Sequence, residues 1–272
     1  MHHTRFFRLG LAFAALSVGG CFAVTDLGRF ERKQPTNPNF YDIEFTVNGM
    51  TSHVAEMFEL RILDENGVVQ TRVLGQPLGG PTAHFTIPAA VDKRQRGTKL
   101  AFFADHNLSK QFDLAPAPGD HSWTLALDGF KPDPLDDVIR VSFDHTTIFQ
   151  TLDAPKDVGV TALVRVVNAG AIKGRRFQAR IADASSRHVV GIYRVPEVKD
   201  PTFEAKVPGV IDSAQGTRYQ VEITLDDGNG GGLQGFRLFG DSGANGSGLD
   251  VTFDPGAAPR ADGILPPSEP PL

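Results

Sequence analysis

Aspartate and histidine recur together at three places in the first half of the chain. Each place lies at the boundary of a short apolar run, and the side chains concerned are Asp105, His106, Asn107, Asp120, His121, Asp144 and His145. Consecutive antiparallel strands alternate in direction, so the end of a fifth strand, the start of a sixth and the end of a seventh lie at one pole. We therefore expect these side chains to gather there.

Two interpretations of this set remain open. Oxygen donors suit Ca²⁺, whereas mixed aspartate and histidine donors suit Zn²⁺ or another transition metal. Alternatively, Asp and Asn occur there only because they hydrogen-bond their own backbone in turns. The second half of the chain has acids without histidines at the equivalent pole, namely Asp226, Asp227, Asn229 and Asp254.

The remaining patterns specify no reaction. The sequence contains no H-E-x-x-H, G-x-S-x-G or C-x-x-C motif. Residues 228–232 (GNGGG) are expected to join two strands and not to open a helix, which argues against a phosphate-binding loop. Asp136 and Asp137 lie in a proline-rich loop where we expect them to be solvated, and Trp123 is expected in the core.

The elements that position these side chains are expected to be short strands. Gly occurs 29 times and Pro 19 times, which favours turns over long helices. Alternation with a period of two, as in Phe58-Glu59-Leu60-Arg61-Ile62, predicts half-buried strands, and Asn66-Gly67 predicts a hairpin turn. The expected strands lie near residues 40–48, 56–63, 68–74, 82–87, 98–105, 121–127 and 137–144, and near 160–167, 175–183, 188–195, 202–207, 217–225, 233–239 and 249–253.

The two halves resemble each other. Residues 58–64 (FELRILD) match 177–183 (FQARIAD), residues 97–100 (GTKL) match 216–219 (GTRY), and residues 139–144 (IRVSFD) match 249–254 (LDVTFD), in the same order. This indicates a tandem duplication. The predicted fold is all-β, with two tandem seven-stranded antiparallel β-sandwich domains after a signal peptide. They resemble immunoglobulin or fibronectin sandwiches, and the Gly-Thr-x-(Leu/Tyr) element resembles transthyretin-like ones.

The amino-terminal segment predicts export and a lipid anchor. Arg5 and Arg8 precede an apolar stretch that is too short to span a bilayer and fits a signal peptide. Residues 18–21 (VGGC) resemble the lipobox of bacterial lipoproteins, which implies lipidation of Cys21. The alternative is an ordinary signal peptide with Cys21 incidental. Since Phe22, not Asp, follows the cysteine, the resemblance implies the outer membrane of the cell envelope.

The expected organisation follows from these segments. Residues 1–20 form the signal peptide, 21–39 the lipidated cysteine and a polar tether, 40–150 the first domain, 157–254 its duplicate and 255–272 a proline-rich disordered tail. Cys21 is the sole cysteine, so no intramolecular disulfide forms.

Three functions are compatible with this organisation. The net charge of −5 argues against nucleic acid as a partner. The leading hypothesis is a membrane-anchored, non-catalytic binding or structural module, with an envelope protein or a glycan as its partner. The alternatives are a metal-dependent surface enzyme that uses the Asp/His pole, and a mechanical spacer.

Overall fold

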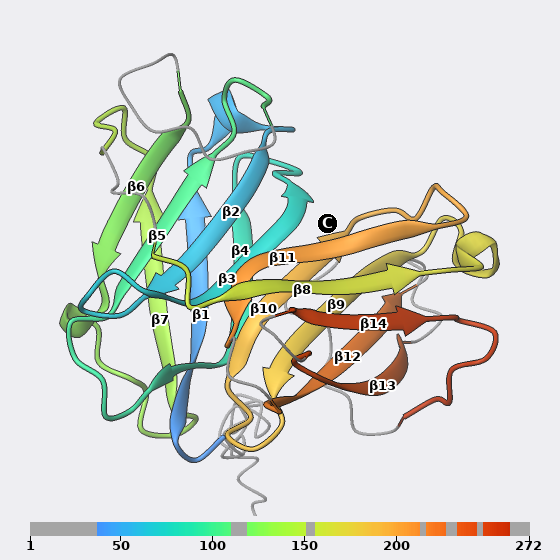
Figure 1. Ribbon diagram of the computed structural model, residues 1–272. Helices are drawn as coiled ribbons and strands as arrows, with labels where there is room; N and C mark the ends of the chain where they lie inside the picture. Colours follow the sequence, from blue (N-terminus) through green and yellow to red (C-terminus); the bar gives the residue numbers. More distant parts are fainter. Residues whose placement is uncertain are drawn as a thin grey trace, which may run out of the picture. The chain divides into compact units, whose positions relative to one another are not determined.

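A computed structural model describes residues 37–109, 119–150, 156–212, 216–226, 233–243 and 247–261. In these ranges the protein is all-β, as the sequence predicts (Figure 1). Short 3₁₀ turns lie between consecutive strands, at Thr51–His53, Leu127–Gly129 and Ala169–Ile172. Within the described ranges, no helix has the length and apolar character needed to cross a membrane. The signal peptide, Cys21 and most of the tether and tail lie outside the described residues.

The strands of the first half follow the expected runs closely. They are β1 (Phe40–Asn48), β2 (Met57–Leu63), β3 (Val69–Pro77), β4 (Ala83–Asp92), β5 (Lys99–Ala104), β6 (His121–Ala126) and β7 (Val138–Asp144). The second half contains β8 (Val160–Val166), β9 (Arg176–Asp183), β10 (Val189–Val195), β11 (Phe203–Ile211), β12 (Arg218–Asp226), β13 (Leu233–Asp241) and β14 (Leu249–Phe253).

The same strand order occurs in both halves. Two three-stranded sheets have the orders β4-β1-β7 and β11-β8-β14, and one eight-stranded sheet has the order β13-β12-β9-β10-β3-β2-β5-β6 (Figure 1). Adding seven to each strand number of the first half gives the order of the second. This repetition supports the proposed duplication.

The sheets are mixed, whereas we had expected antiparallel sheets. In each half the first and last strands pair in parallel, β1 with β7 and β8 with β14. The halves also join in parallel, through β3 and β10, with Ile192 opposite Val73. A period-two pattern specifies which face of a strand is buried but not which strand lies beside it, so these pairings could not be read from the sequence.

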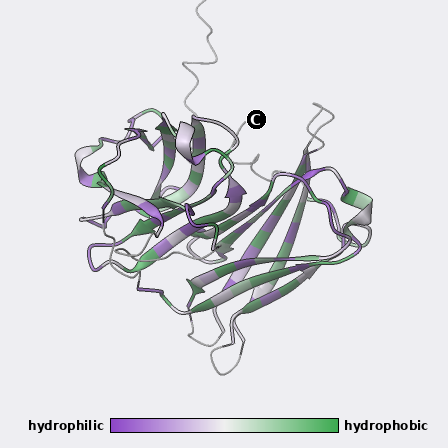
Figure 2. Ribbon diagram, turned by 90° about the horizontal axis from the view of Figure 1, so that it is seen from above, coloured by the Kyte–Doolittle hydropathy of each residue, from purple (hydrophilic) through white to green (hydrophobic). Residues whose placement is uncertain are grey.

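The two hydrophobic cores lie on opposite faces of the eight-stranded sheet. Val73 pairs with Leu60 on one side and with Ile192 on the other, and Ile192 pairs with Arg180, so these four side chains share a face. In the first half that face belongs to the core. In the second half it is polar, and the core lies under the alternate residues of β9, such as Ile181. Figure 2 shows the corresponding alternation of hydrophilic and hydrophobic residues along the strands.

Aromatic packing fills the first core. The ring of Phe102 packs against two others, with centroids 5.0 Å from Phe45 and 5.8 Å from Phe58. Trp123 is 1% exposed and stacks on Phe102, which confirms its expected place in the core.

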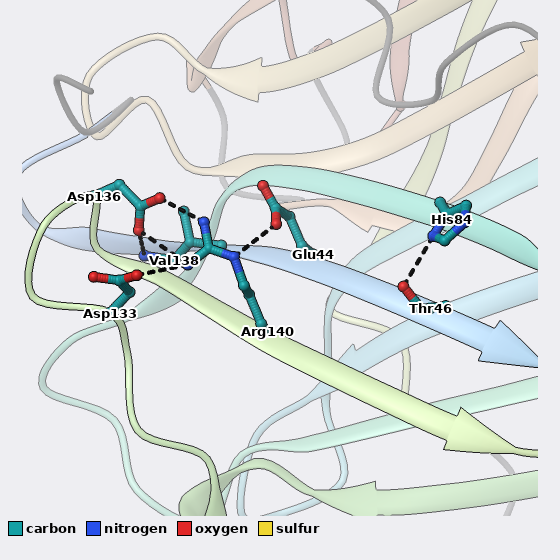
Figure 3. Close-up of polar contacts among 7 residues, drawn as sticks. All are labelled: Glu44, Thr46, His84, Asp133, Asp136, Val138 and Arg140. Atoms are coloured by element: carbon teal, nitrogen blue, oxygen red, sulfur yellow. Dashed lines mark hydrogen bonds and ion pairs between the residues drawn. The ribbon is translucent and has the colours of Figure 1, made fainter. Parts of the chain in front are cut away.

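The loop before β7 differs from its expected state. Asp136 pairs with Arg140, which also contacts Asp133 and Glu44 (Figure 3). Asp137 pairs with Lys93 at 2.8 Å. The two carboxylates that we expected to be solvated are therefore engaged in ion pairs. The cation that pairs with Asp136 lies four residues along the same segment, and the one that pairs with Asp137 directly follows β4.

Candidate functional site

The polar residues of the first half do meet at one pole. The ends of β1, β5 and β7 and the start of β6 lie there, and the backbone N–H of His145 donates to Asn48 O at 2.9 Å, joining the ends of β7 and β1. Four histidines gather at this pole, which we call the histidine pole: His53, His106, His121 and His145.

His53 is the centre of this cluster. Its Nε2 lies 3.2 Å from Nε2 of His145 and 3.5 Å from Nδ1 of His121. The His53 ring is perpendicular to the His121 ring, and the rings of His106 and His121 stack with centroids 4.2 Å apart. His53 is only 1% exposed, whereas His106 has a half-exposed side chain.

Glu56 links two of the histidines. Its Oε2 lies 2.7 Å from Nδ1 of His53, and its Oε1 lies 2.9 Å from Nδ1 of His106. The chain turns back between His53 and Glu56, where Ala55 has a φ of +71° and the Glu56 N–H donates to His53 O at 3.0 Å. Such a backbone costs on the order of 1–3 kcal/mol outside glycine. The local structure therefore holds the carboxylate beside both rings.

Burial favours the neutral form of His121 and His145. The pKa of His121 is lowered by desolvation, and then by the neighbouring His106 and His53. The pKa of His145 is lowered by desolvation and by His53. Both pKa shifts favour the neutral imidazole, which is the form that binds metal ions.

The aspartates and asparagine of the predicted set have other partners. Asp105 Oδ1 and Asn107 Oδ1 both accept the backbone N–H of Ser109, at 2.9 and 3.0 Å, as expected for turn residues. Asp144 Oδ1 accepts from Asn48 at 3.1 Å, and Asp120 is buried. The histidines of the predicted set therefore lie together. Three of its oxygen donors instead accept hydrogen bonds from nearby turn or strand residues.

The equivalent pole of the second half has no such convergence among its described residues. Asp254 accepts from Asn168 at 2.7 Å, and Asp226 lies 3.5 Å from Arg176. Asp227 and Asn229 lie outside the described residues.

His53 and Glu56 were not among the predicted site residues. Both lie in the loop between the first and second strands, and the alternation of strand direction assigns that loop to the same pole. The signal was therefore available: a histidine and a glutamate three residues apart at a strand end.

Comparisons with known proteins assign no family. No family model matches the chain, and no curated protein matches it. Among solved structures it is similar to a candidate cell adhesion protein from Bacteroides eggerthii, with 11% identity, coverage of 87% of this chain and 93% of the other, and a TM-score of 0.26. Another is a candidate polysaccharide-binding protein from Bacteroides thetaiotaomicron, with 9% identity, coverage of 79% and 90%, and a TM-score of 0.19.

A third similar structure is a candidate adhesin from Bacteroides ovatus, with 10% identity, coverage of 79% and 86%, and a TM-score of 0.20. TM-scores this low do not establish a shared fold. Nothing about the function of this chain follows from the three likenesses.

Exposed apolar side chains follow three of the four cluster histidines in the sequence. Val54 follows His53, Leu108 follows the turn at His106, and Ile148 and Phe149 follow His145. Their exposed fractions are 42%, 66%, 76% and 41%. We call these four residues the apolar collar. Phe149 also stacks on His121, with ring centroids 3.7 Å apart, so this member of the collar contacts the cluster directly.

Proposed function

We propose that the protein is a lipid-anchored, non-catalytic binding module of the cell envelope, and that it captures a partner protein at the histidine pole. The apolar collar carries this proposal. Exposed apolar side chains that gather in one region of a protein mark interaction sites, whereas singly scattered ones carry no such signal. Four of the seven large apolar side chains that are exposed in the described ranges belong to the collar.

The position of the collar supports capture away from the anchor. The chain enters β1 at Phe40 and leaves it at Asn48, beside the histidine pole. Since β1 has nine residues, its first and last Cα atoms are about 26 Å apart at about 3.3 Å per residue. A tether that joins Cys21 to Phe40 therefore reaches the domain at the end opposite the collar.

The chemistry of the collar favours a protein over a glycan. Val54, Leu108 and Ile148 are aliphatic, whereas sugars stack on exposed aromatic faces. Phe149 is the aromatic member of the collar, and His121 already covers one of its faces. The buried core of a protein–protein interface is more apolar than the rest of a protein surface, which fits these four side chains.

Site-specific photocrosslinking in the native cell tests this proposal. A benzoylphenylalanine residue at Ile148 should give a discrete crosslinked product that disappears when Leu108→Glu is added. The matched control is the same probe at Leu135, which is 56% exposed and precedes β7 at the opposite pole. Equal products from both positions, or none from Ile148, would overturn the proposal.

A metal-dependent surface enzyme is the second candidate. The convergence of His106, His121 and His145 favours it, because that hypothesis required these side chains to meet. Its test is the hydrolysis of p-nitrophenyl acetate by the purified protein before and after EDTA. A rate that EDTA does not change, or that His106→Ala leaves intact, would exclude this candidate.

A further inference from the structure

We propose that His53, His106 and His121 form a binding site for one divalent transition metal ion, with Zn²⁺ as the best fit, and that Glu56 supports it from behind the ligands. The inference rests on the geometry of the cluster and not on the binding role of the apolar collar. One nitrogen from each of the three rings lies within 4.8 Å of the other two.

The spacing of the nitrogens fits a tetrahedral metal ion. Zn–N bonds of about 2.0–2.1 Å place two nitrogens about 3.3 Å apart on a tetrahedron. His53 Nε2 and His121 Nδ1 are 3.5 Å apart. This pair therefore needs only a small side-chain rotation to share an ion. The rings of His106 and His121 stack with centroids 4.2 Å apart, so they must turn relative to each other before both can point a nitrogen at the same ion.

Glu56 selects the ligand nitrogens. A carboxylate oxygen beside Nδ1 of a histidine accepts an N–H from it, which leaves Nε2 unprotonated. Glu56 makes this contact with both His53 and His106 through its two oxygens. Nε2 is then the ligand nitrogen of both rings. Metal-binding histidines almost always have such a carboxylate or carbonyl partner.

The donor set decides between the metals that the sequence left open. Ca²⁺ takes six to eight oxygen ligands, as a rule, whereas imidazole nitrogen suits Zn²⁺, Cu²⁺ and Ni²⁺. The oxygens of Asp105 and Asn107 accept a backbone N–H, and Asp144 is paired with Asn48. The site therefore fits a transition metal and not calcium.

The three histidines leave the fourth coordination position to an outside ligand. His145 approaches His53 to 3.2 Å but is not a member of the group whose nitrogens are all mutually close. Sites with three protein ligands keep an open position, which water or another donor occupies. The half-exposed His106 side chain provides solvent access to it.

A competing interpretation is a hydrogen-bonded histidine cluster that binds no ion. In that case Glu56 and His53 only satisfy buried polar groups, and the rings need no metal. The two interpretations differ in metal stoichiometry, so titration separates them.

The test is isothermal titration of the full-length protein, purified in detergent and stripped with EDTA, with ZnCl₂ and separately with CaCl₂. We expect one Zn²⁺ per chain and no heat with Ca²⁺. His106→Ala should abolish the Zn²⁺ heat, and Glu56→Gln should weaken binding by about 10–100-fold. His84→Ala is the matched control, because His84 is an exposed histidine on β4 that contacts Thr46 (Figure 3).

Two further measurements separate loss of the metal site from loss of folding. Co²⁺ bound by four ligands gives an intense visible absorption, and an open position lets added azide shift that spectrum. Thermal unfolding of each variant without metal checks that His106→Ala is folded. Absence of Zn²⁺ binding by the wild type, or equal binding by His106→Ala and His84→Ala, would overturn the site. A Co²⁺ spectrum unchanged by azide would overturn the open position.

Discussion

His188 is a half-buried histidine outside the histidine pole. It lies in the turn before β10, where its ring stacks on Phe40 with centroids 4.9 Å apart and its Nε2 lies 3.3 Å from Ala90 O. Desolvation lowers its pKa, although the Ala90 carbonyl and nearby Asp183 and Asp92 oppose the shift. The folded protein therefore disfavours the protonated form of this side chain.

This burial predicts a loss of stability in acid. Below the ordinary pKa of about 6.5, the unfolded chain binds a proton at His188 that the folded protein does not, so the free energy of unfolding falls as pH decreases. Above that pH the contribution is constant. His188→Gln cannot be protonated, so its free energy of unfolding relative to wild type should rise as pH falls from 7.5 to 5. A difference independent of pH in urea titrations would contradict this.

For single residues, the sequence predicted which side chains lie at the pole better than it predicted what each of them contacts. It placed His106, His121 and His145 at one pole because strand alternation depends only on the number of strands. It also weighed Asp105 and Asn107 as ligands, although both hold the Ser109 turn. Sequence spacing cannot distinguish a side chain that faces its own backbone from one that faces a neighbouring loop.

At the scale of elements, the junction between β3 and β10 depends on Gly75. Gly75 has a φ of +97°, and a Cβ atom there would lie 2.5 Å from Arg194 O. Gly67 also has a positive φ, of +76°, but a Cβ there would meet no atom within 4 Å. A comparison of the two positions therefore separates the cost of backbone strain from the cost of a steric clash with the neighbouring strand.

Alanine at each position should therefore cost different amounts. Gly67→Ala is expected to lower the free energy of unfolding by about 1–2 kcal/mol through backbone strain alone. Gly75→Ala should lower it by a further ~1–3 kcal/mol, because the added methyl group displaces the β10 backbone. Chemical denaturation of both variants measures the difference. Equal losses would show that β10 can move away from Gly75 at no cost.

The strands themselves were predictable and their partners were not. Alternation in residues 58–62 identifies β2, and the Asn66-Gly67 pair identifies the turn toward β3. The parallel pairings of β1 with β7 and of β3 with β10 join segments far apart in the chain. Such pairings arise from tertiary packing, which no local pattern encodes.

At the scale of the whole molecule, the anchor remains a prediction because Cys21 lies outside the described residues. Lipidation of this sole cysteine would be the only covalent link to a membrane. Cys21→Ala should therefore move the protein from the membrane to the soluble fraction after cell fractionation. Phe22→Ala, which keeps the cysteine, is the control and should stay with the membrane. Unchanged membrane association of Cys21→Ala would contradict the lipobox.

The division into two domains also remains a prediction, and several contacts oppose independent halves. Val69 of β3 belongs to the core of the second half, and Ile192 of β10 belongs to the core of the first. The described residues just before β8 are held as well, because Arg72 pairs with Asp157 at 2.9 Å and Val69 N donates to Lys156 O at 2.9 Å. Neither core is complete without a residue from the other half.

These shared contacts predict one cooperative unfolding transition. Trp123 is the sole tryptophan and lies in β6, at the opposite edge of the eight-stranded sheet from β13. Its fluorescence therefore reports the first half, whereas far-ultraviolet circular dichroism reports both. The two signals should give coincident urea transitions in the wild type, the usual criterion for two-state unfolding. In Gly75→Ala they should separate, because that variant weakens the β3–β10 junction through which the halves are coupled. Separate transitions in the wild type would mean that the halves are independent domains, and that the eight-stranded sheet joins them without making them one folding unit.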